Sequence, residues 1–135
     1  MYQKFLQYFK NNNIKIFLKY DGEREKNFYT VIIFNKEKNN KLFKNTDKPY
    51  ETFVNFISEL NIHVSNEVNK QLYKSFEELK KKLTQKVNND VVFVYTVELK
   101  EDVEYYISIE SNEITTNYKD TELDNIFNFV KNLDF

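Results

Sequence analysis

The apolar residues of this chain repeat with two different periods, which alternate along the sequence. Spacings of three and four residues predict helices over residues 2–11, from Pro49 to Leu60, from Ser65 to Lys86 and from Thr121 to Leu133. Alternating or continuously apolar stretches predict strands over 14–18, 28–34, 91–99 and 103–109. Two further short strands are expected at 41–44 and 114–118.

Three residues at the predicted helix starts have side chains suited to that position. Pro49 fits a first helical turn because its missing N–H would have no partner there. Ser65 and Thr121 each precede an apolar stripe and are expected to act as N-caps.

The order of these elements predicts an α+β fold in a single domain of residues 1–135. Short connections between successive strands favour a mainly antiparallel sheet of five or six strands, with helices packed on one face. The expected order is helix, two or three strands, two helices, two or three strands and a final helix. With 13 Phe and 10 Tyr, the core is expected to be rich in aromatic rings.

Composition limits what the lysines indicate. The chain has 19 Asn, 19 Lys and one Arg (Arg24), but no Ala and a single Gly (Gly22), as an AT-rich genome would encode. The lysines are therefore a weak argument for nucleic-acid binding, since arginine is the better reader of phosphate and guanine. No nucleic-acid partner is expected.

The sequence also suggests where the protein works. Its longest apolar run, 91–97, is much shorter than the roughly 18 residues of a membrane-spanning helix. Lysines interrupt the apolar positions at the N-terminus, unlike a secretory signal, and the chain has no cysteine. We expect a cytoplasmic protein with no membrane partner.

Few residues here are suited to catalysis. One glycine excludes the common phosphate-binding loops, and one histidine (His63) without cysteine excludes the usual zinc sites, so no cofactor or metal is expected. The remaining catalytic pattern is Asp90 followed by Glu98 and Lys100, which is similar to the D…ExK arrangement of metal-dependent nucleases. Such a triplet arises readily in a chain with 30% charged residues. The favoured expectation is that the protein is not an enzyme.

Charge is distributed unevenly along the chain. Residues 1–50 hold 11 basic and 5 acidic residues, whereas residues 98–124 hold 9 acidic and 2 basic residues. An acidic hairpin in the second half attracts basic partners and speeds their association. The alternative is that these acids only form a solvated surface. The candidate partner-binding residues are Glu98, Glu101, Asp102, Glu104, Glu110 and Glu113.

The long amphipathic helix from Ser65 to Lys86, followed by the hairpin VVFVYTVELKEDVEYYISIES, resembles the YezG-like family of antitoxin and immunity proteins. This resemblance implies a small α+β protein that binds and neutralises a secreted nuclease toxin. The element order is also similar to that of type III secretion chaperones, which are small dimeric proteins that hold an unfolded effector segment. Both resemblances imply protein binding, although nothing in the sequence indicates a homo-oligomer.

The leading hypothesis is therefore a cytoplasmic immunity protein of a polymorphic toxin system, which occludes the active site of a basic toxin domain. A secretion chaperone or another protein-binding adaptor is the alternative, and a metal-dependent nuclease is the hypothesis from a different class.

Overall fold

The fold is described from a computed structural model over residues 2–11, 13–86, 92–111 and 114–132. Its helices are α1 (Gln3–Lys10), α2 (Pro49–Glu59), α3 (Asn66–Lys86) and α4 (Leu123–Lys131). Its strands are β1 (Ile14–Asp21), β2 (Tyr29–Asn35), β3 (Asn40–Thr46), β4 (Val92–Leu99), β5 (Val103–Ser111) and β6 (Ile114–Asp120). The predicted α+β class and element order are confirmed, including both short strands.

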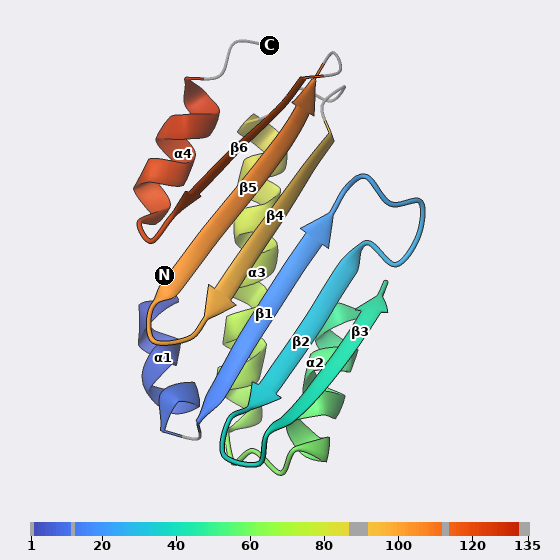
Figure 1. The fold of residues 1–135 in the computed structure, drawn as a ribbon, viewed down its shortest axis with the longest axis vertical. Coiled ribbons are helices and arrows are strands. Elements are labelled where there is room, and N and C mark those ends of the chain that lie inside the picture. Colours follow the sequence, from blue (N-terminus) through green and yellow to red (C-terminus); the bar gives the residue numbers. More distant parts are fainter. Residues whose placement is uncertain (1, 12, 87–91, 112–113, 133–135) are drawn as a thin grey trace.

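The six strands form one antiparallel sheet in the order β3-β2-β1-β4-β5-β6. Each three-stranded group is sequential along the chain, and the two groups join where β1 pairs with β4. The helices pack on one face of the sheet. In Figure 1, α2 and α3 lie behind the strands, and α1 and α4 lie at the left side. None of the helices among the described residues is long and apolar enough to span a membrane.

The core lies between the sheet and the helices. Side chains such as Ile16, Val31 and Ile107 point from the strands into this layer, where Leu72 and Leu83 of α3 meet them. Each fully buried aliphatic side chain stabilises the fold by about 1.5–3 kcal/mol through removal of apolar surface from water.

Aromatic side chains fill much of this layer. Tyr95 of β4 stacks on Phe76 of α3, with ring centroids 4.7 Å apart. Its buried hydroxyl donates a hydrogen bond to the Phe76 carbonyl at 2.7 Å. Tyr2 and Tyr105 are also buried, with ring centroids 5.8 Å apart. The aromatic core expected from the composition is present.

Asparagine holds several turns that glycine holds in most proteins. Among the described residues, backbone conformations with positive φ occur at Asn13, Asn27, Asn39 and Asn61. Asparagine tolerates this left-handed region better than other residues with a Cβ. A chain with one glycine therefore still makes tight turns.

Two of the three predicted helix starts are as expected. α2 begins at Pro49, and the Ser65 hydroxyl accepts a hydrogen bond from the Val68 N–H at 3.2 Å. The prediction for Thr121 is wrong, because Glu122 is the N-cap residue of α4. The Asp120 carboxylate accepts the Glu122 N–H at 2.7 Å, just before the helix, and the Glu122 side chain makes no capping hydrogen bond.

Candidate functional site

The sheet face without helices carries a defined set of side chains, which we call the open face. Successive strand residues point to opposite faces, so Phe17 points away from the core that contains Ile16 and Leu18. The strand registers then connect outward residues into rows across the sheet. One row crosses five strands and consists of Phe43, Ile32, Phe17, Glu98 and Glu104.

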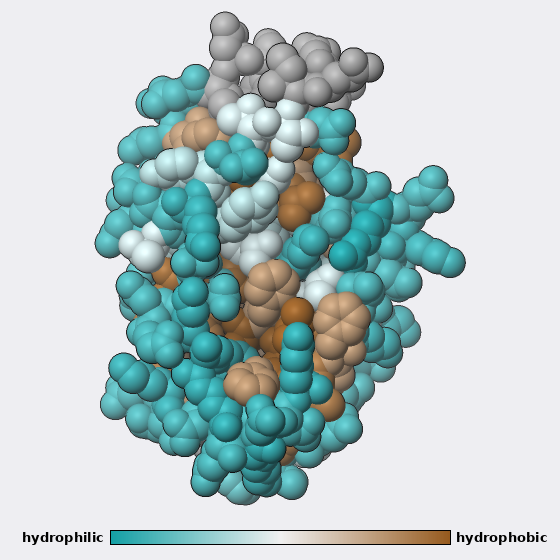
Figure 2. Space-filling model, in the orientation of Figure 1, coloured by the Kyte–Doolittle hydropathy of each residue, from teal (hydrophilic) through white to brown (hydrophobic). Residues whose placement is uncertain are grey.

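Four large apolar side chains lie together on the open face over β1, β2 and β3. We call Phe17, Ile32, Phe34 and Phe43 the apolar patch. Phe43 is 57% exposed, and the other three are partly buried. Figure 2 shows brown side chains gathered in the lower part of this face with hydrophilic residues around them. Apolar side chains that reach the surface together, unlike scattered ones, are typical of an interaction surface.

A groove of about 550 Å³ extends over β1, β4 and β5 on the same face. Phe17, which also belongs to the apolar patch, lies in its lining together with Val94 and Tyr106. The groove is thus both apolar and charged. Its ionisable lining residues other than tyrosine are Lys19, Asp21, Glu23, Glu98, Glu104 and Lys119.

Glu98 and Glu104 face each other directly in the β4–β5 register. Two like charges in this position repel each other, and nearby lysines offset the repulsion. The Lys100 Nζ lies 3.9 Å from the Glu98 carboxylate and 3.5 Å from that of Glu104, which also contacts the Lys119 Nζ at 3.0 Å. The hydrogen bond from Lys119 lowers the pKa of Glu104, and the Lys100 charge adds to this effect. Glu104 is therefore ionised at neutral pH.

The turn between β4 and β5 holds two further candidate partner-binding acids, and each of them accepts a hydrogen bond. The Glu101 carboxylate lies 3.1 Å from the Lys36 Nζ, and this hydrogen bond lowers the pKa of Glu101. Asp102 accepts the Val103 N–H at 2.8 Å. Lysines and backbone groups thus offset part of the negative charge that the sequence concentrates here.

The remaining candidate acids lie away from this turn. Glu110 is exposed near the other end of β5, about 20 Å from Glu104 at 3.4 Å per residue. Partial desolvation and the nearby Glu110 carboxylate raise the pKa of Glu23. Glu113 lies outside the described residues. The structure therefore brings together Glu98 and Glu104 in the groove and separates Glu110 from them.

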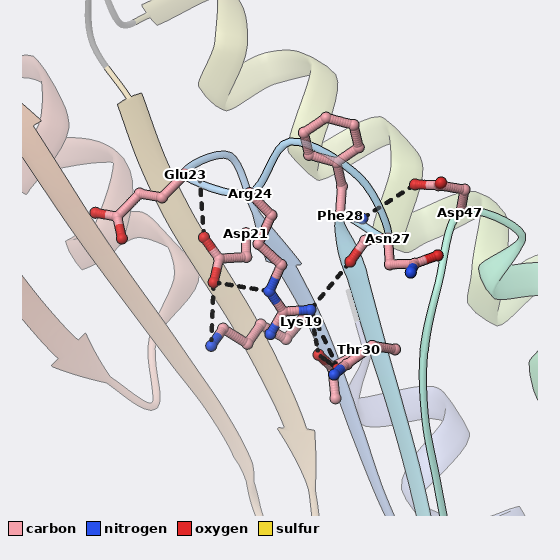
Figure 3. A network of polar contacts seen from close by, with 9 residues as sticks. Lys19, Asp21, Glu23, Arg24, Asn27, Phe28, Thr30 and Asp47 are labelled. Atoms are coloured by element: carbon pink, nitrogen blue, oxygen red, sulfur yellow. Dashed lines mark hydrogen bonds and ion pairs between the residues drawn. The ribbon is translucent and has the colours of Figure 1, made fainter.

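The loop between β1 and β2 borders the groove and is held by the chain's one arginine (Figure 3). The Arg24 guanidinium lies 3.3 Å from the Asp21 carboxylate and donates to the Asn27 carbonyl at 3.0 Å. It also donates to Thr30 and Asn45, each at 3.1 Å. With these four contacts, Arg24 stabilises the loop.

The residues of the D…ExK pattern and His63 lie in different parts of the chain. Asp90 lies outside the described residues, whereas Glu98 and Lys100 form the ion pair given above. Within the described part of the chain, no three His, Cys, Asp or Glu side chains form a group that could hold a metal ion. His63 is exposed in the segment between α2 and α3.

The predictions from the sequence did not include the apolar patch, although the sequence contains one signal for it. The run Val31-Ile32-Ile33-Phe34 is apolar at both outward and inward positions. A strand with helices on only one side must expose half of such a run. Combining the continuous apolar run with the one-sided helix layer would have identified Ile32 and Phe34.

Comparisons with models of known protein families, with curated proteins and with solved structures found no match to this chain.

Proposed function

We propose that this chain is an immunity-type protein, similar in role to the YezG-like family, which binds a cognate toxin domain through its open face. In this proposal the toxin is a nuclease, and the bound protein occludes its active site in the cytoplasm.

The observation that carries the proposal is the composition of the open face. One side of the sheet has a helix layer and a conventional core, whereas the other exposes the apolar patch beside a groove with carboxylates. Protein interfaces commonly combine apolar anchors with charged groups near them, and aromatic side chains supply much of their binding energy. A nuclease active site binds phosphates and is basic, so Glu98 and Glu104 match it in charge.

The test begins with capture of the partner. The tagged chain is used to isolate bound proteins from its own cells, and the partner is then produced and purified separately. A partner encoded beside this chain is expected to degrade DNA or RNA, and one equivalent of this chain is expected to stop the degradation. A partner without toxin activity contradicts the proposal, and one bound only while unfolded favours a secretion chaperone instead.

A pair of variants tests the surface. Glu98→Lys on the open face should slow association with the toxin about tenfold, because charge complementarity acts mainly on the association rate. Glu59→Lys on α2 makes the same charge change on the helix side and should leave association unchanged. Equal slowing by the two variants would show that the association rate depends on the net charge of the chain and not on this surface.

The competing nuclease hypothesis has its own measurement. The purified chain is expected to cleave neither DNA nor RNA when magnesium or manganese is present. Cleavage that disappears in Glu98→Gln would establish the D…ExK pattern as an active site and refute the immunity role.

A further inference from the structure

The open face has a fixed spacing between its apolar and its acidic parts. The row Phe43, Ile32, Phe17, Glu98 and Glu104 places one residue on each of five adjacent strands. Ile32 on β2 is the middle of the three apolar residues. The midpoint between Glu98 and Glu104 is two and a half strand spacings away, or about 12 Å at 4.8 Å per strand.

We propose that the open face recognises a two-part surface on a partner protein, consisting of an apolar cluster and, about 12 Å from it, a lysine or arginine side chain. The inference rests on the proposed function, because it specifies the chemistry of the partner at that same face.

The acidic part of the row has capacity for a further cation. Among the described residues, the one ion pair of Glu98 is the 3.9 Å contact with Lys100, which lies even closer to Glu104. Glu104 also contacts the Lys119 Nζ at 3.0 Å, so the acceptor positions left for a further N–H donor are mainly those of Glu98. An incoming cation also reduces the repulsion between Glu98 and Glu104.

The groove also suits the long stem of a basic side chain. Phe17 lines it directly opposite Glu98, and Val94 lines it further along β4. Lysine and arginine place their methylene groups along apolar surface while the charged end reaches a polar partner. A neutral polar side chain would lack the charge attraction, and an acidic one would be repelled.

The apolar and the acidic residues of this row belong to one hydrogen-bonded sheet. β1 carries Phe17 and pairs directly with β4, which carries Glu98. The spacing is therefore set by strand pairing and needs no loop movement before binding. Preorganisation of this kind lowers the entropic cost of association.

Helical peptides can test this spacing, because a helix rises 1.5 Å per residue and so places side chains at known separations. The probe is an alanine-based peptide of about 18 residues with a Trp–Leu pair and, seven residues further, an arginine about 10.5 Å away on the same side. One comparison peptide has glutamate in place of the arginine, and another has the arginine three residues from the pair, about 4.5 Å away. Binding to the ¹⁵N-labelled chain is followed through its amide signals.

The first peptide is expected to bind about tenfold more tightly than either comparison peptide, a difference of about 1.4 kcal/mol. It should shift signals of residues 15–19, 30–34, 41–45 and 96–106. The double change Glu98→Gln and Glu104→Gln should remove the preference for arginine, whereas Glu59→Gln with Glu78→Gln on the helix side should keep it. Circular dichroism verifies that both double variants are folded.

Equal binding of the three peptides, or shifts confined to α2 and α3, would overturn the proposal. Open-face signals that change when the chain alone is diluted would also overturn it, because a second copy would then be the occupant. These outcomes need no toxin, so a failure here is distinguishable from a failure of the immunity role.

Discussion

Phe17 of β1 lies directly opposite Glu98 of β4 in the antiparallel register. The apolar part of the open face and its acidic part meet at this pair, between the two central strands. Because β1 and β4 come from different halves of the chain, their pairing creates a surface that neither half contains alone.

Phe43→Ser tests whether the apolar patch serves binding rather than folding. Phe43 is 57% exposed, so the substitution should change the free energy of unfolding by no more than about 0.5 kcal/mol. The same change should weaken binding of the toxin at least about tenfold, mainly through faster dissociation. Urea denaturation and binding kinetics measure the two effects, and unchanged kinetics would exclude Phe43 from the interface.

Glu104→Gln tests the ion pairs in the groove through their pH dependence. The folded protein holds the pKa of Glu104 below its ordinary value of 4.5, chiefly through the Lys119 hydrogen bond. This stabilisation is present above that value and is lost as the pH falls through the lower, folded-state pKa. The wild type should therefore be more stable than the variant at pH 7, by at most about 1 kcal/mol, with the difference vanishing in acid.

Urea denaturation from pH 7 down to pH 3 measures this difference. Glu25→Gln, an exposed position in the β1–β2 loop, is the matched control and should show no such change. A difference that stays constant with pH would mean that the ion pairs of Glu104 do not stabilise the fold.

Tyr95→Phe tests the hydrogen bond between β4 and α3. The substitution removes the 2.7 Å bond to the Phe76 carbonyl while keeping the ring. We expect the free energy of unfolding to fall by about 1–2 kcal/mol, since a buried hydrogen bond is lost. Tyr106→Phe on the open face is the control and should change it by less than about 0.5 kcal/mol. Equal stabilities of the two variants would contradict the expectation.

Gly22→Ala tests the close approach of the β1–β2 loop to β4. A Cβ at this position would lie 2.8 Å from the Phe93 carbonyl oxygen. The Gly22 N–H donates to that same oxygen at 3.0 Å, so relief of the clash would disturb this bond. We expect Gly22→Ala to lower the free energy of unfolding by about 1–3 kcal/mol, measured by thermal or urea denaturation. Glu25→Ala in the same loop is the control and should lower it little. Full stability of Gly22→Ala would show that the loop moves freely away from β4.

The periodicity of the chain already encodes the local elements and the side of each strand that faces the core. Alternation in β5, with Val103, Tyr105 and Ile107 apolar, predicts both the strand and its buried side because side-chain direction has a period of two. It also determined the fold class, since short connections favour antiparallel neighbours. The uneven distribution of charge is likewise a property of the sequence alone.

Which side chains share a surface depends on how the strands pair in three dimensions. The pairing of β1 with β4 places Phe17 beside Glu98, although 80 positions separate them in the sequence. Likewise, Lys36 reaches Glu101 and offsets an acid whose partner the sequence does not identify. Local periodicity carries information about neighbours within one element, whereas strand order depends on how all the elements bury their apolar faces together. The candidate site is a product of strand order, so local sequence patterns could name its acids and, in its apolar half, at most Ile32 and Phe34.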